Sequence, residues 1–203
     1  MGAITRLEAR WLMRANEDDD DVRAWVAARD IAGLESLLLD HYLALGHLTC
    51  CSIQVGYFID VDGRAWSDDG TVDEPWMTMT FLKAVGDLLA SDTADARAHP
   101  WEESSMRLVR RGDLLVMEDV HGSGSVSMPR VEVPFHELVE GVRREGEVIA
   151  AIANGLRLEI ERRRAGGADA AVLARLAVVE ENVASAQMVE ELERLVARLR
   201  SPP

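Results

Sequence analysis

The stretch CSIQVGYFIDVDG, residues 51–63, decides the class of fold. Apolar residues occupy every second position of it, which is the pattern of a β-strand with one buried face. The apolar positions are Cys51, Ile53, Val55, Tyr57, Ile59 and Val61. The Asp62-Gly63 pair that follows is a strong hairpin signal. We therefore expect residues 64–66 to return antiparallel to this strand.

Two regions further along the chain also have the pattern of short strands. Residues 106–120 form two apolar runs divided at Gly112-Asp113, a pair suited to a type II′ turn. Residues 126–133 form another run, and Pro129 within it indicates a sheet edge or a bulge. Residues 91–105 are expected to precede them as a connecting loop. The middle of the chain is therefore predicted to be a small antiparallel sheet.

Helices are predicted before the first strand and after its hairpin. Apolar residues three and four apart indicate short amphipathic helices over residues 4–15 and 22–26. A third stripe of this kind covers residues 31–45. After the hairpin, a further helix is predicted from Phe81. The residues available as its N-cap are Thr78 and Thr80.

Two long helices are predicted at the C-terminal end. The first begins at Pro134, whose fixed φ suits a first helical turn, and continues to about Arg164. Gly166-Gly167 ends it, and a second apolar stripe over residues 172–199 shifts phase once. Two helices joined by a short glycine turn are expected to fold back on each other as an antiparallel hairpin.

Together these elements predict an α+β fold. A small antiparallel sheet is flanked by N-terminal helices and by the long C-terminal helical hairpin. Residues 1–134 are expected to form an acidic α+β domain. Residues 135–203 are expected to form a helical hairpin that packs on this domain or extends from it, as one structural unit.

The chain is strongly acidic, with 36 Asp and Glu against 22 Lys and Arg and a net charge of −14. Residues 1–134 carry 24 acidic and 12 basic groups, so most of the surplus lies there. This charge argues against nucleic acid as a direct partner, because phosphate binding needs clustered Lys and Arg. It favours a basic protein partner, since a field of one sign speeds association with a partner of the opposite sign.

Cysteine and lysine usage indicates where the protein works. The only cysteines are the adjacent Cys50 and Cys51, which cannot join distant parts of a fold and are expected to be reduced thiols. No stretch reaches the roughly 18 apolar residues of a membrane span. Lys83 is the single lysine beside 21 arginines, which suggests a GC-rich bacterial coding bias. We therefore expect a bacterial cytoplasmic protein that contacts no membrane.

Acidic residues alternate with tryptophans around and after the predicted hairpin. Tryptophan is a preferred anchor of protein interfaces, and acidic neighbours attract a basic partner. A buried tryptophan beside solvated acids is the common structural alternative. The residues expected to bind a partner are Asp60, Asp62, Trp66, Asp68, Asp69, Asp73, Glu74 and Trp76.

No catalytic constellation stands out, so an enzymatic role stays open while a non-enzymatic one is favoured. The run Asp60-Val61-Asp62-Gly63 begins like a calcium loop, but Arg64 and Ala65 follow where such a loop needs an oxygen ligand and a glycine. The five histidines form no zinc-type pair. We expect neither a metal nor a cofactor. The open alternative is a metal-dependent hydrolase or transferase that uses Asp60, Asp62, Asp68 and Asp69.

The order of elements in the middle of the chain resembles that of a known group of proteins. A strand pair around Arg110-Arg111-Gly112-Asp113-Leu114 precedes Val131-Glu132-Val133-Pro134-Phe135, which leads into Leu138 and Val142. This layout, over residues 48–145, is similar to that of the compact α+β immunity proteins of bacterial toxin systems. The resemblance implies an acidic inhibitor that binds and blocks a toxin. The C-terminal hairpin lies outside it and leaves open a dimeric scaffold or adaptor assembled through these helices.

Overall fold

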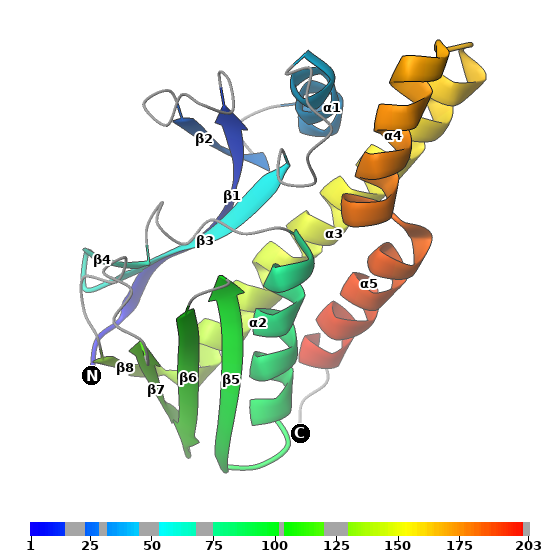
Figure 1. Ribbon diagram of the computed structural model, residues 1–203. Helices are drawn as coiled ribbons and strands as arrows, with labels where there is room; N and C mark the ends of the chain where they lie inside the picture. Colours follow the sequence, from blue (N-terminus) through cyan, green and yellow to red (C-terminus); the bar gives the residue numbers. More distant parts are fainter. Residues whose placement is uncertain are drawn as a thin grey trace.

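The computed structural model describes residues 1–14, 23–28, 32–44, 53–67, 75–101, 104–119 and 130–200. Within these residues the chain forms two four-stranded antiparallel sheets and five α-helices (Figure 1). The predicted α+β class is confirmed. Where the sequence indicated one small sheet, the structure has two.

The first sheet is built around the predicted hairpin. Its strands are β1 (Ile4–Arg14), β2 (Arg23–Ala27), β3 (Gln54–Val61) and β4 (Arg64–Ser67), in the order β2-β1-β3-β4. Asp62 and Gly63 join β3 to β4 with φ values of 52° and 73°. Both values are positive, as a type I′ turn requires, so the hairpin prediction is confirmed.

Strands β1 and β2 stand where two N-terminal helices were predicted, so that prediction is wrong. The core residues of β1 include Leu7, Ala9 and Trp11, which are two apart. Leu7 and Trp11 are four residues apart, and this separation places two residues on the same face of either a helix or a strand. Only Ala9 distinguishes the two patterns, and alanine gives a weak signal of burial.

The second sheet contains β5 (Thr93–Trp101), β6 (Ser104–Arg111), β7 (Leu114–Asp119) and β8 (Arg130–Pro134), in sequential order. Gly112 has a φ of 62° in the β6–β7 turn, which fits the first central position of the predicted type II′ turn. The edge position predicted for the last strand is confirmed for β8. Residues 126–129, including Pro129, lie outside the described residues.

Strand β5 replaces the loop predicted over residues 91–105. Its side chains that pack toward the core include Ala94 and Ala96. Alanine is depleted in strands, and β5 also contains Pro100 near its end. Neither the composition of this segment nor the spacing of its apolar residues therefore identifies it as a strand. Pairing with β6 over Thr93–Ala98 defines the strand instead.

Along the sequence, helix α1 follows β2 and helix α2 follows β4. Helix α1 covers Leu34–Ala44 and confirms the predicted third stripe. Helix α2 covers Pro75–Leu88, so it begins before the predicted start at Phe81. Proline is favoured in a first helical turn, and the predicted N-caps Thr78 and Thr80 lie inside the helix instead.

The C-terminal hairpin is confirmed and contains three helices. Helix α3 covers Phe135–Ala165, with Pro134 as its N-cap residue, and Gly167 follows its end with a φ of 83°. Helices α4 (Ala170–Val183) and α5 (Ala186–Arg200) return along it. Ala184 and Ser185 separate α4 from α5. This break explains why the apolar stripe predicted over residues 172–199 changes phase once.

Residues from both parts of the chain share one hydrophobic core, which extends from Leu7 in β1 to Leu199 in α5. Two glycines let α3 approach its neighbours. A Cβ atom on Gly141 would lie 2.9 Å from Leu7, and one on Gly146 would lie 2.8 Å from Leu82 and 2.9 Å from Val196. Helix α3 is therefore the element that holds β1, α2 and α5 together.

The first residues of the chain connect the two sheets. The Gly2 N–H donates to the Glu132 carbonyl of β8 at 2.7 Å. The Ala3 N–H donates to Asp62 Oδ1 at 2.9 Å, and the Asp62 N–H donates back to the Ala3 carbonyl at 3.0 Å. None of the described helices is both long and apolar enough to cross a membrane.

Candidate functional site

Two of the predicted partner-binding acids have intramolecular partners. Asp60 lies on β3 and pairs with Arg6 on β1, with 2.8 Å between Oδ1 and Nη2. Asp62 lies in the β3–β4 turn and accepts the Ala3 N–H. Both carboxylates therefore stabilise the first sheet, and Asp60 shares its charge with a guanidinium.

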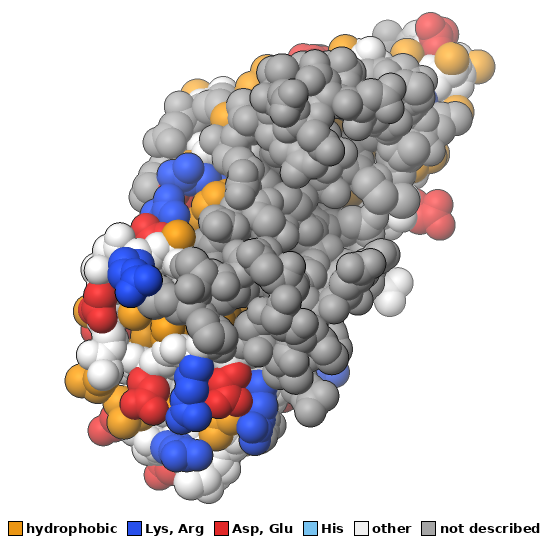
Figure 2. All heavy atoms as spheres, turned by 60° about the vertical axis from the view of Figure 1, so that its left-hand side comes forward, with side chains coloured by type: hydrophobic (Ala, Val, Ile, Leu, Met, Phe, Trp, Pro, Cys, Tyr) orange, Lys and Arg blue, Asp and Glu red, His pale blue; other side chains and the backbone are white. Residues whose placement is uncertain are grey.

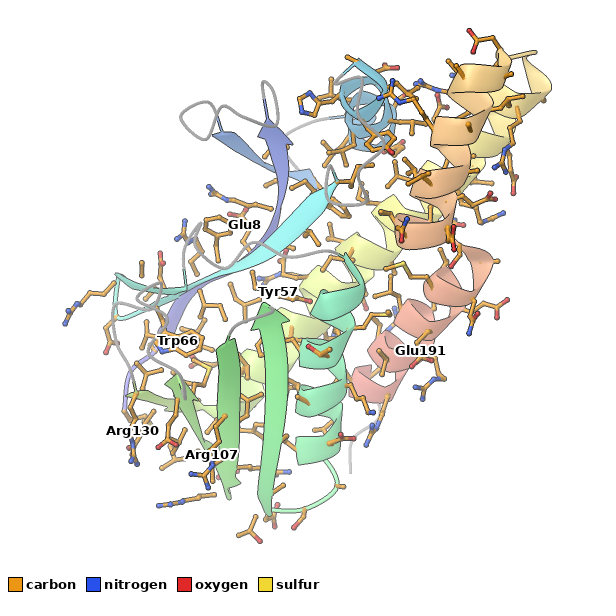
Figure 3. The ribbon with its side chains drawn as sticks, viewed as in Figure 1. Glu8, Tyr57, Trp66, Arg107, Arg130 and Glu191 are labelled. Carbon is orange, nitrogen blue, oxygen red and sulfur yellow. The ribbon has the colours of Figure 1, made fainter. Side chains whose placement is uncertain are left out.

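Trp66 lies in the core, so its predicted place on a partner-binding surface is wrong. Its side chain extends from β4 toward the second sheet and is only 1% exposed (Figure 3). The indole packs in the same cluster as the core residues of both sheets. The alternative interpretation, a buried tryptophan beside acids, is correct for Trp66.

The remaining predicted residues lie at or beyond the start of α2. Trp76 is the second residue of α2, and Asp68, Asp69, Asp73 and Glu74 lie outside the described residues. Helix α2 and strand β5 run antiparallel, so the start of α2 and the end of β5 at Trp101 lie at the same end of this helix–strand pair (Figure 1). The topology therefore brings together two tryptophan positions that are far apart in sequence.

An outer-face cluster covers the side of the first sheet that faces away from α3. It consists of Arg6, Glu8, Arg10, Phe58 and Asp60. Glu8 is 3% exposed and accepts Arg10 Nε at 2.7 Å, and it lies opposite Phe58 in the β1–β3 register. The Arg6 and Arg10 guanidinium carbons lie 5.5 and 5.3 Å from the Phe58 ring centroid. The cation–π contacts stabilise this face, and Arg10 gives the buried Glu8 carboxylate a partner.

A second buried carboxylate lies between the first sheet and α3. Glu145 is 7% exposed and accepts the Ala9 N–H and Arg144 Nε, each at 2.9 Å. Burial, and then the charge of Glu145, raise the pKa of Tyr57 far above its ordinary range. Tyr57 therefore stays protonated, and its ring packs edge-on against Phe81 with 5.1 Å between centroids.

Two solvent-accessible hollows border α3. A groove of about 440 Å³ separates β1 from the first turns of α3. A second hollow of about 460 Å³ lies between α3 and α5. Among the described residues, no three His, Cys, Asp or Glu side chains come close enough together to hold a metal ion. Of the four acids in the metal-site alternative, Asp68 and Asp69 lie outside the described residues.

The net charge is unevenly divided along the chain. Residues 1–134 hold 24 acidic and 12 basic groups, and residues 135–203 hold 12 and 10, so −12 of the −14 comes from the first part. The acidic runs of that part include residues 17–21, 68–69, 73–74 and 102–103.

The described charges largely neutralise one another. On the outer face of the second sheet, Glu118 lies 3.4 Å from Arg107 and 3.3 Å from Arg130. Figure 2 shows basic and acidic side chains intermixed on this part of the surface. On α3, Arg143 pairs with both Glu140 and Glu147 at 2.5 Å. Ion pairs therefore neutralise much of the charge on these two surfaces.

Sequence reasoning missed Glu8 and Glu145 as buried groups. Glu145 follows Leu138 and Val142 at helical spacing, so a charge at a core position was visible in the sequence. Glu8 has no such signal, because it lies on the face of β1 that the strand pattern assigns to solvent. No protein family matches the sequence, and no curated protein or solved structure is significantly similar to it.

Proposed function

We propose that this protein is a non-enzymatic binding module that occludes a basic protein partner, as an immunity or antitoxin-like inhibitor does. The observation that carries the proposal is the acidic surplus of residues 1–134, which hold 24 acidic and 12 basic groups. Four of these acids, Asp68, Asp69, Asp73 and Glu74, fall within seven residues of sequence. A concentrated field of one sign raises the rate of association with a basic surface and selects against acidic partners.

The proposed contact region lies around the start of α2. It includes Asp68, Asp69, Asp73 and Glu74 in the sequence directly before the helix, and Trp76 in its first turn. Asp60 and Asp62 precede this region in the sequence, on the β3–β4 hairpin, where they contact Arg6 and Ala3. Trp66 is buried and is not part of the region. Acidic groups would steer a partner, and Trp76 would supply the apolar anchor. We place the protein in the bacterial cytoplasm, because its adjacent cysteines suit reduced thiols.

The proposal is tested by capture and by salt dependence. The full chain is immobilised, binding proteins are recovered from the native cytosol, and each purified candidate is titrated at several salt concentrations. We expect a basic protein whose affinity falls steeply as salt rises, because screening weakens charge attraction. A set of recovered proteins in which none is basic and salt-sensitive would refute the proposal.

Two charge-matched triple variants locate the surface. Asp68→Asn, Asp69→Asn and Asp73→Asn together remove three acids before α2. The control, Glu181→Gln, Glu190→Gln and Glu193→Gln, removes three exposed acids from α4 and α5. We expect the first variant to bind at least tenfold more weakly and the control to stay near wild type. Equal loss in both would show that only total charge matters.

A further inference from the structure

Strand β1 is longer than the strand that pairs with its outer edge. Strand β3 pairs with it over Ile4–Leu12, on one side. On the other side, β2 pairs only with Arg10–Arg14. Within the described residues, the segment Ile4–Ala9 therefore has no strand along its second edge.

The backbone groups on this open edge are a template for another strand. Alternate residues of a strand direct their N–H and C=O groups to the same side. Leu7 and Ala9 therefore face the same edge as Trp11, which pairs with Val26 of β2. The register shift between Ile4 and Arg6 turns the Ile4 N–H to this edge as well. An unpaired edge of this kind invites pairing with a second chain unless something covers it.

Side chains of α3 cover these groups one by one. Glu137 Oε2 accepts the Ile4 N–H at 3.1 Å, Arg144 Nη2 donates to the Leu7 carbonyl at 2.9 Å, and Glu145 Oε2 accepts the Ala9 N–H at 2.9 Å. Carboxylates accept where a neighbouring strand would present carbonyls, and a guanidinium donates where it would present an N–H.

The helix is placed for this role by its own sequence. Arg144 and Glu145 follow Glu137 by seven and eight residues, about two helical turns, so all three reach β1 from one side of α3. Between them, Gly141 lets the helix approach, because a Cβ atom there would lie 2.9 Å from Leu7. Glu145 keeps its carboxylate in a site that is 7% exposed, where only a paired charge is tolerated.

We propose that Glu137, Arg144 and Glu145 take the place of a missing strand and prevent β1 from pairing with β1 of a second copy. A second copy is the matching occupant, because two identical edges related by a twofold axis are antiparallel and self-complementary. A groove of about 440 Å³ borders this cover and is lined by Ile4–Glu8 of β1 and by the first turns of α3.

The test compares variants that remove the cover with variants that keep it. Glu145→Ala leaves the Ala9 N–H without its acceptor, whereas Glu145→Gln retains an oxygen at the same position. Glu137→Ala with Arg144→Ala removes the two part-buried contacts and guards against a folding defect of the Glu145 variant. The control, Arg157→Ala with Glu161→Ala, removes an exposed ion pair of α3 that lies away from β1.

Mass is measured by light scattering over a hundredfold range of concentration, and amide exchange is measured at Ile4 and Ala9. We expect Glu145→Ala and the double variant to exchange these amides at least tenfold faster and to form dimers as concentration rises. Wild type, Glu145→Gln and the control are expected to stay monomeric. Variants that expose these amides yet remain monomeric, or a wild type that already dimerises through β1, would overturn the proposal.

Discussion

Arg110 joins three parts of the structure, and its replacement should destabilise the fold strongly. Its side chain is 9% exposed. It donates to the carbonyls of Leu88 at 2.9 Å, Ser91 at 3.2 Å and Gly112 at 3.0 Å. The guanidinium carbon also lies 4.2 Å from the centroid of the Phe135 ring. One residue therefore ties the end of α2 and the β6–β7 turn to the start of α3.

The expected cost of Arg110→Met follows from these contacts. A hydrogen bond from a charged donor contributes about 1.5 to 3 kcal/mol, and water replaces part of it where the carbonyl is near the surface. The ion pair with Asp92, whose side chain is 86% exposed, adds little. We expect a loss of about 3 kcal/mol in the free energy of unfolding. Arg110→Lys keeps the positive charge but not the planar set of guanidinium N–H donors. We therefore expect it to lose about 2 kcal/mol in the free energy of unfolding.

Urea unfolding followed by circular dichroism measures both values, with Arg111→Met as the control. Arg111 is the next residue along β6, and it is exposed. The control should change the free energy of unfolding by less than about 0.5 kcal/mol. If Arg110→Met falls within about 1 kcal/mol of wild type, the contacts of Arg110 do not hold these segments together.

Two further predictions concern α3. Hydrogen bonding, first to Arg162, lowers the pKa of Glu159 from 4.5 to about 2, so Glu159 stabilises the folded chain above about pH 4.5 and loses this contribution as pH falls toward 2. Glu159→Gln should therefore flatten the dependence of urea midpoints on pH between 2 and 5, and an unchanged slope would contradict this. Gly146→Ala should lower stability by about 1 to 3 kcal/mol in thermal melts, because its methyl would lie 2.8 Å from Leu82. Gly155→Ala should be neutral or stabilising, since its methyl meets only a flexible side chain of α1 at 3.1 Å and alanine favours a helix. Equal effects of the two alanines would refute the packing argument.

Strong periodic patterns predicted the elements that carry many large apolar residues. The strand over Gln54–Val61 and the helix over Phe135–Ala165 both present a clear apolar face, and both are where the sequence placed them. Two of the missed strands share one cause. Strands β1 and β5 use alanine at inward positions, and burial of alanine comes from pairing with neighbouring strands rather than from its own hydrophobicity. Such pairing depends on residues that are distant in sequence.

The candidate site was predictable in its charge but not in its geometry. Composition showed that the first two thirds of the chain hold the acidic surplus. It did not show that Asp60 would pair with Arg6, or that Trp66 would fill the core, because both outcomes depend on strand register and on the second sheet. A tryptophan next to acidic residues has the same local sequence whether its ring points inward or outward.

The cover of β1 by α3 has a consequence for synthesis on the ribosome. The contacts of Ile4 and Ala9 with α3 span 133 and 136 residues of sequence. The first sheet therefore leaves the exit tunnel long before the helix that completes its edge. Contacts of such long range slow folding, and a nascent chain meets other nascent chains on the same message during this interval. We conclude that the last third of this chain is needed for the first eleven residues to reach their final state.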